Sequence, residues 1–370
     1  MTPPRPLITA PSAWIGAELA QRPETWTYTL SAAEIDEIES AIATLRGQDI
    51  ASVTRADFPL PKLGPVLDGL RQEILNGRGF VLLRGLPVTD RPIEDSAMAY
   101  WGIGTYFGHA RSQNAKGHVL GHVRDMGLAT TDPNVRIYQT TERQNFHTDS
   151  CDIVGLLCLK TAQSGGLSSL TSSRSVYNAM AERHPDLVHR LFQPMPTDRR
   201  GEVPAGKKPW FELPIYNDYE GFLSALYAPH YVRSSQRFPE APRLTDQDIA
   251  ALDCFDRLAE DTTLRLDMEL QPGDIQLVHN HTTLHDRTAF VDWPEPDRKR
   301  HLLRLWLAAP GARPLPAGYA ERWGSVTIGD RGGIICEGTR LHAPLKSRRR
   351  APWIRQSASA DLQHWRASAS

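Results

Sequence analysis

Cysteine is scarce in this 370-residue chain, and its placement excludes two common uses of the residue. The cysteines form no Cys-x-x-Cys pair and no zinc-ligand spacing; they are Cys151, Cys158, Cys254 and Cys336. We therefore expect reduced, buried thiols rather than a disulfide framework. Cys151 lies two residues after Asp149, but no base can be assigned to it, so a nucleophile role is not indicated.

Long apolar runs and a strong net charge are also missing. No stretch approaches the roughly 18 apolar residues of a membrane span, and residues 1–20 lack the pattern of a signal peptide. A formal net charge of −1 gives no overall attraction to nucleic acid or anionic lipid. We expect a cytoplasmic protein that binds neither nucleic acid nor membrane. The 40% hydrophobic and 23% charged residues are typical of a globular protein with an ample core.

The patterning predicts a helical N-terminal layer over about residues 1–115. Ser31 and Glu34 form a capping box at the start of a helix, and a second helix covers about residues 66–74. The glycine-bounded stretch Phe80–Arg84 is typical of a buried strand, and residues 93–107 favour another helix.

From about residue 118 the hydrophobic period changes to two, which indicates a β-rich core over about 118–310. Helices are predicted at 175–190 and from Thr245. The remaining segments are expected to be strands: 122–126, 136–140, 154–159, 167–172, 266–270, 274–278 and 302–307. Many short strands closed by helices favour a mainly β fold, a jelly-roll double-stranded β-helix.

No internal repeat or linker divides the chain, so residues 1–345 are expected to form one domain. Residues 194–242 are predicted to be an insertion with little regular structure, either a lid over a binding site or a solvated connection. Residues 346–370 form a basic tail that we expect to be flexible; a contact across an oligomer interface is the alternative, which leaves open a homo-oligomer.

The candidate site begins at His147-Thr148-Asp149. In a strand, alternate side chains share a face, so His147 and Asp149 project to the same side. With a second imidazole from elsewhere they would form the 2-His-1-carboxylate triad that binds Fe(II) and leaves positions open for other ligands. The short motif is weak evidence alone, since about one His-x-Asp is expected by chance in a chain of this composition.

The second imidazole could come from any of three histidines near the end of the β-rich part: His279, His281 or His285. Spacing alone does not choose among them. Residues 279 and 281 share a strand face, and at least one of them is expected to be a core or supporting residue.

An apolar strand downstream carries two arginines on one face, Arg300 and Arg304. Buried guanidinium groups are costly unless each meets an anion, and arginine binds a carboxylate through two parallel hydrogen bonds. The alternative is that one or both pair with Asp297 or Glu295 near the start of the strand.

Taken together, His147-Thr148-Asp149, the segment 165–168 (Gly-Gly-Leu-Ser), the segment 280–287 and Arg300 to Arg304 resemble the taurine/2,4-dichlorophenoxyacetate dioxygenase family. The similarity runs from about residue 79 to 307. It implies an oxidoreductase with a double-stranded β-helix that uses Fe(II), 2-oxoglutarate and O2, within the clavaminate-synthase-like superfamily.

The resemblance implies that the iron ligands are His147, Asp149 and His285, and that Arg300 and Ser168 bind the distal carboxylate of 2-oxoglutarate. Leu167-Ser168 departs from the more common acidic residue and Thr, so Ser169 is an alternative to Ser168. Arg304 is expected to contact an acidic group of the substrate or to share the co-substrate carboxylate.

The implied reaction converts 2-oxoglutarate to succinate and CO2 and hydroxylates an unactivated C–H bond; desaturation or cyclisation is the variant outcome. Asp149 argues against halogenation, because halogenating relatives lack this carboxylate. We expect a small carboxylate-bearing or amino-acid-like substrate, read by Arg304 together with Tyr138, Gln139 and Asn145.

Two other readings remain. A cupin-type metalloenzyme would use the same barrel with Mn, Ni or Zn and no 2-oxoglutarate, and would not require Arg300. A non-catalytic member would bind 2-oxoglutarate as a sensor. Nucleic-acid demethylation is disfavoured by the balanced charge and the lack of a basic, aromatic surface stripe.

Overall fold

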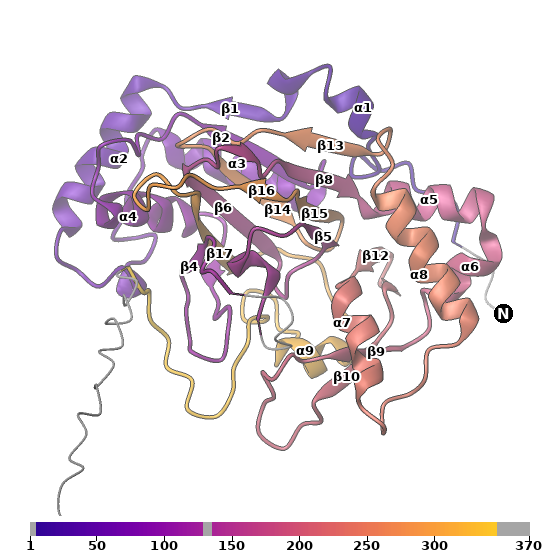
Figure 1. The fold of residues 1–370 in the computed structure, drawn as a ribbon. Helices are drawn as coiled ribbons and strands as arrows, with labels where there is room; N and C mark the ends of the chain where they lie inside the picture. The colour runs from indigo at the N-terminus through magenta and orange to yellow at the C-terminus, as the bar shows by residue number, and fades with distance from the viewer. Residues whose placement is uncertain (1–4, 129–134, 346–370) are drawn as a thin grey trace, which may run out of the picture.

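The structure, a computed structural model, describes residues 5–128 and 135–345. Within them, two β-sheets pack face to face, and helices cover the outer side of each sheet (Figure 1). The tail that was expected to be flexible, 346–370, lies outside the described residues. No helix in the described part of the chain has the length and apolar character needed to cross a membrane.

The larger sheet of the described residues has the order β1-β2-β14-β6-β17-β3, with β4 also paired to β17. Its strands are antiparallel except for the pair β1 and β2. The strands are β1 (Thr27–Thr29), β2 (Phe80–Arg84), β3 (His109–Ala110), β4 (Gly121–Val123), β6 (Ile153–Lys160), β14 (Ile275–His279) and β17 (His301–Ala308).

The smaller sheet has the order β13-β8-β15-β5 and is antiparallel throughout. Its strands are β5 (Gln144–His147), β8 (Ser168–Ser172), β13 (Arg265–Met268) and β15 (Thr283–Arg287). A short pair, β7 (Ser164–Gly165) and β16 (Phe290–Val291), lies at its margin. Apolar side chains from both sheets, among them Phe80, Leu170 and Trp306, form one core between them. This is the expected jelly-roll double-stranded β-helix.

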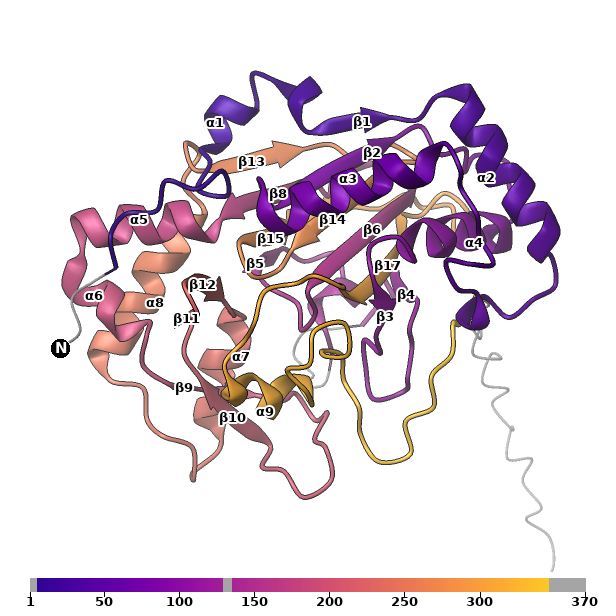
Figure 2. The same cartoon turned by 180° about the vertical axis from the view of Figure 1, so that it is seen from behind.

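Helices enclose the two sheets. The larger sheet is covered by α2 (Ala32–Leu45), α3 (Leu63–Asn76) and α4 (Ile93–Gly104), and Figure 2 shows α3 across β2 and β14. The smaller sheet is covered by α5 (Ser173–Arg183), α6 (Pro185–Arg190) and α8 (Asp246–Ala259). The short helices are α1 (Gly16–Leu19), α7 (Pro229–Ser234) and α9 (Ala320–Trp323).

Local chemistry explains several helix ends. Ser31 caps α2 through the predicted capping box with Glu34, and Thr245 caps α8 in the same way. The single helix predicted over 175–190 is instead two helices, α5 and α6. Pro185 causes the break, because the residue before a proline is disfavoured in helical geometry; His184 has φ −141° and ψ 56°.

Two other expectations were wrong. Residues 136–140 do not form a strand; they contain the 3-10 turn Ile137–Gln139. Residues 194–242 contain more regular structure than expected. The sequence did not reveal it, because each strand has only four residues and is too short to show a clear period of two. The segment holds two hairpins and a helix: β9 (Met195–Asp198) with β10 (Trp210–Leu213), β11 (Tyr216–Tyr219) with β12 (Phe222–Ala225), and α7.

Candidate functional site

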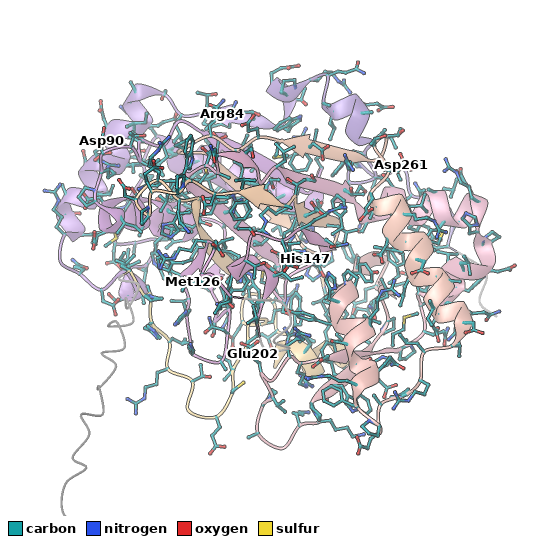
Figure 3. The ribbon with its side chains drawn as sticks, viewed as in Figure 1. Arg84, Asp90, Met126, His147, Glu202 and Asp261 are labelled. Carbon is teal, nitrogen blue, oxygen red and sulfur yellow. The ribbon has the colours of Figure 1, made fainter. Side chains whose placement is uncertain are left out.

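The site is built on a cross-strand pair. His147 on β5 lies directly opposite His285 on β15, so both rings project from the same face of the smaller sheet, with centroids 4.1 Å apart. Asp149 lies two residues beyond the end of β5. Its Oδ1 lies 3.8 Å from His147 Nε2 and its Oδ2 lies 3.7 Å from His285 Nε2. In Figure 3, His147 lies near the centre of the molecule. The fold therefore brings the three predicted residues together.

This arrangement fits a divalent metal ion. One donor atom from each residue lies within 4.8 Å of the others, so small rotations bring all three within the bond length of about 2.0–2.2 Å. His147 Nδ1 lies 2.8 Å from the backbone oxygen of Asn145 and can donate to it, which leaves the Nε2 lone pair for a metal. Burial, helped by the nearby His285, lowers the pKa of His147 to about 3, so the ring is neutral at pH 7.

Asp149 is held as a carboxylate in a fixed orientation. Burial alone would raise its pKa, but the charge of Arg304 and the adjacent His285 outweigh it and hold the pKa of Asp149 well below its usual range. The indole N–H of Trp306 donates to Oδ2 at 2.7 Å, and the backbone N–H of Asp149 donates to Asn280 Oδ1 at 2.9 Å.

His279 and His281 belong to a different cluster. His279 Nδ1 lies 3.1 Å from Thr282 Oγ1, and His281 Nε2 lies 2.9 Å from Asp152 Oδ1. Asp152 also binds Arg331, and both of these side chains are 0% exposed. These two histidines are therefore core residues, as expected for at least one of them.

A small cavity, here called the inner cavity, lies between the sheets beside His147 and His285. Its other lining residues are Val123, Tyr138, Gln144, Leu156, Ser168, Leu270, Asp286, Arg287, Arg300, Leu302 and Arg304. Of the two candidate serines, Ser168 lines the inner cavity and Ser169 does not. The hydroxyl of Ser169 instead donates to Asp267 Oδ1 at 2.6 Å.

Arg300 brings a buried cation to the inner cavity. Its side chain is buried, and Nη1 has no hydrogen-bond partner among the described residues. Burial lowers the pKa of Arg300 to about 10, so it remains a cation at pH 7. The alternative pairing near the strand start is not found in the described structure: Glu295 pairs with Arg298 at 3.6 Å. A buried, unsatisfied guanidinium fits the carboxylate of a co-substrate.

A second cavity, here called the outer cavity, opens on the other side of the metal-binding candidates. The segment 194–242 contributes ten of its lining residues, and α9 contributes one, Arg322. It is lined by Arg136, Ile137, Tyr138, Gln144, Asn145, His147, Thr148, Asp149, Ser150, Thr197, Phe211, Leu213, Leu226–Val232, Arg304, Trp306 and Arg322.

The predicted substrate residues are distributed unevenly around this cavity. Tyr138 and Arg304 line both cavities, and Asn145 lines the outer one. Gln139 lines neither, because it turns back on its own 3-10 turn, where its side chain accepts from the backbone N–H of Arg136 at 3.4 Å. Arg304 is well engaged: Nε donates to Gln113 Oε1 at 2.8 Å and Nη1 lies 3.4 Å from Asp149 Oδ2.

Sequence reasoning missed three residues of the site. The amide nitrogen of Gln144 lies 2.9 Å from His147 Nε2, so it must turn away when that nitrogen binds a metal. Trp306 follows Arg304 by two positions on β17, and the strand period could have revealed it. Arg322 comes from α9, beyond the last core strand, where no local pattern pointed to the site.

Comparisons with known proteins agree with this geometry. The sequence model described as "Taurine catabolism dioxygenase TauD, TfdA family" matches residues 39–306. FR-33289 synthase from Streptomyces rubellomurinus is 30% identical over 323 residues, covering 86% of this chain and 95% of its own.

Solved structures show the same fold. An asparagine oxygenase in complex with Fe(II), 3-hydroxyasparagine and succinate superposes with a TM-score of 0.59 at 16% identity, covering 76% of this chain and 93% of its own. The non-haem iron oxygenase OrfP in complex with Fe and alpha-ketoglutaric acid gives 0.57 at 14% identity, with 76% and 93% covered.

A jelly-roll core with two imidazoles and one carboxylate converging at its inner face, in a chain that matches this family, defines a non-haem iron dioxygenase that uses 2-oxoglutarate and O2. This chain belongs to the taurine catabolism dioxygenase TauD, TfdA family. Family membership decides against the cupin-type reading without 2-oxoglutarate. The convergence of three intact ligand residues argues against the non-catalytic reading.

Proposed function

We propose that His147, Asp149 and His285 hold the Fe(II), and that Arg300 with Ser168 binds the distal carboxylate of 2-oxoglutarate in the inner cavity. The observation that carries this assignment is the convergence of the three donor atoms beside a buried guanidinium that lacks a partner in the described structure. A ligand carboxylate would give Arg300 Nη1 the anion that the protein itself does not supply.

The enzyme hydroxylates a C–H bond of a small substrate held in the outer cavity. Iron with 2-oxoglutarate supplies the oxidising chemistry: O2 is consumed, succinate and CO2 are released, and one oxygen atom enters the substrate. The chain supplies placement. Trp306 and Asn280 hold Asp149 in one orientation, and Phe211 and Leu213 give the outer cavity an apolar wall that limits access of water.

A small carboxylate-bearing or amino-acid-like molecule is the substrate class that the outer cavity supports best. Arg304 lies where the two cavities meet, so it can face an acidic group of either ligand. Tyr138 packs against its guanidinium at 4.7 Å and Asn145 lies beside it in the wall. The asparagine oxygenase structure contains a hydroxylated amino acid, which fits this class.

Residues 194–242 act as a cover for the substrate within a single domain, 1–345. The segment contributes Thr197, Phe211 and Leu213 to the outer cavity and is joined to the metal-binding loop through Thr148, whose backbone N–H donates to Tyr227 O at 2.7 Å. A cytoplasmic location is supported by the four free cysteines.

The test is anaerobic protein with Fe(II) and 2-oxoglutarate, screened against carboxylic and amino acids for perturbation of the visible charge-transfer band. Hits are then incubated in air, and succinate and hydroxylated product are quantified. We expect equal amounts of succinate and product from wild type and neither from His285→Ala. Arg300→Gln should raise the KM for 2-oxoglutarate. Succinate formation that is independent of residue 285 would contradict the assignment.

A further inference from the structure

The outer cavity contains one cation that has no acidic partner within the described residues. Arg136 forms an ion pair with Glu202, and Arg304 lies 3.4 Å from Asp149. Arg322 makes one hydrogen bond, from Nε to Ser150 Oγ at 2.9 Å, and no ion pair with any described residue. Its guanidinium lies near the ring of Phe211, 5.8 Å from the centroid, in the cavity wall.

Arg322 remains a cation in the free enzyme. Burial, together with the positive charge of Arg136, lowers the pKa of Arg322 to about 10, yet the group stays protonated at pH 7. The guanidinium is half-buried in the cavity wall and forms no ion pair with a described residue, so it can meet an anion that enters the cavity. The two terminal nitrogens, which make no hydrogen bond to the described protein, are suited to two parallel hydrogen bonds with an oxyanion.

The short helix that carries Arg322 is anchored to the core through its neighbours. The neighbouring Trp323 packs on the ring of His281 at 5.2 Å, and the backbone N–H of Gly332 donates to Trp323 O at 3.0 Å. Arg331 is fixed by Asp152 at 2.7 Å, which ties the segment after α9 to the loop that carries Asp149.

The anchor of Arg322 lies next to the metal-binding candidates. Ser150 immediately follows Asp149, and it accepts from Arg322 Nε through its hydroxyl and from Gly333 N–H through its backbone oxygen, at 2.7 Å. An anion bound to Arg322 would therefore sit at a set distance from Asp149. Such preorganisation reduces the entropic cost of binding.

We propose that Arg322 is the specificity-determining residue of the outer cavity and binds an oxyanion of the primary substrate, either a carboxylate or a phosphate. This inference rests on the proposed function, because it assumes that the outer cavity holds the substrate. It assigns the substrate anion to a residue outside the matched segment 39–306, while Arg304 is engaged by Gln113 and Asp149. Arg322 thus selects substrates that carry an oxyanion, and the remainder of the substrate faces Asp149 and His147.

The experiment compares matched probes that differ only in the anion. Comparing the affinity for glycerol 3-phosphate with that for glycerol tests recognition of a phosphate. Comparing L-asparagine with L-asparagine amide tests recognition of a carboxylate. Binding to anaerobic, Fe(II)- and 2-oxoglutarate-loaded full-length protein is followed by the charge-transfer band and by calorimetry. The variants are Arg322→Gln and Arg322→Lys, with Arg298→Gln as the control, because Arg298 lies at the surface with its side chain 50% exposed.

We expect wild type to bind one of the two anionic probes more tightly than its neutral counterpart. Arg322→Gln should lower the affinity for that anion by about tenfold to a hundredfold, the usual range for a charge-assisted hydrogen bond. Arg322→Lys should restore part of the loss, and Arg298→Gln should match wild type. The affinity for 2-oxoglutarate should stay within about twofold in every variant.

Several results would overturn the proposal. It fails if Arg322→Gln binds the preferred anion as wild type does, if both members of each pair bind equally, or if neither anion binds. A parallel loss of 2-oxoglutarate affinity in Arg322→Gln would show that the residue only supports the fold. If wild type itself does not bind 2-oxoglutarate, the proposed function fails instead, so the two failures are distinguishable.

Discussion

Trp306 donates its indole N–H to Asp149 Oδ2 at 2.7 Å, which joins strand β17 to the loop that follows β5. The same carboxylate oxygen lies 3.7 Å from His285 Nε2. The indole therefore fixes the rotation of the carboxylate that we assign to the iron. Hydrogen bonds of this kind orient metal ligands, and their loss commonly weakens metal binding about tenfold to a hundredfold.

Trp306→Phe should weaken Fe(II) binding by about that factor while leaving the fold intact, because the ring volume is largely kept. The measurement is an anaerobic Fe(II) titration. Trp101→Phe is the control, since its indole N–H also bonds inside the protein, to Val53 O at 2.9 Å, and Trp101 lines neither cavity. Equal iron affinity of Trp306→Phe and wild type would show that this hydrogen bond does not position the ligand.

Breaking the ion pair between Arg331 and Asp152 should be strongly destabilising. Both side chains are 0% exposed, and removing one partner leaves the other charge buried, which costs about 3–5 kcal/mol. Urea unfolding of Arg331→Met measures the loss. Arg298→Gln removes an ion pair whose partners are 50% and 51% exposed, and should cost no more than about 1 kcal/mol. Similar unfolding free energies for the two variants would refute this.

Gly166→Ala should raise the KM for 2-oxoglutarate several-fold. A Cβ at residue 166 would lie 3.0 Å from Arg300 Nε, so it would push the guanidinium away from the inner cavity. Gly206→Ala separates this effect from backbone strain, because Gly206 has the same φ of +71° and nothing within 4 Å of its Cβ position. We expect both variants to lose stability and only Gly166→Ala to lose co-substrate affinity. Matching KM values would contradict the steric argument.

Stability should fall as the pH is lowered from about 6.5 to 4. Burial, with His122 adjacent, lowers the pKa of His301 from 6.5 to about 3. In this window the unfolded chain binds a proton that the folded chain does not, so acid favours unfolding. His301→Asn should remove up to about 1.4 kcal/mol per pH unit from this slope. Unfolding by urea across the window measures it, with His109→Asn, at an exposed position, as the control. An unchanged slope in His301→Asn would disagree with this assignment.

Local patterns predicted those parts of the fold that depend on local chemistry. Residue types at short spacing indicated the capping box at Ser31, the helix start at Thr245, the buried strand β2 and the shared face of Arg300 and Arg304. The break at Pro185 was missed, although the proline itself indicates it.

Other features depend on contacts that are distant in the sequence. The register that sets His285 opposite His147 spans 138 positions (285 minus 147), and spacing among three nearby histidines carries no trace of it. Only the family resemblance singled out His285. Arg322 reaches the outer cavity because Arg331 and Ser150 anchor α9, and neither contact leaves a periodic signal.

The central claim is that residues 147, 149 and 285 hold one ferrous ion. Its most direct test is an anaerobic Fe(II) titration of wild type and of His147→Ala, Asp149→Ala, His285→Ala and His279→Ala, with folding checked by circular dichroism. We predict one equivalent of iron bound by wild type and by His279→Ala, and a loss of this binding in the other three variants. Retention of tight, stoichiometric iron binding by His285→Ala, or its loss in a folded His279→Ala, would contradict the account.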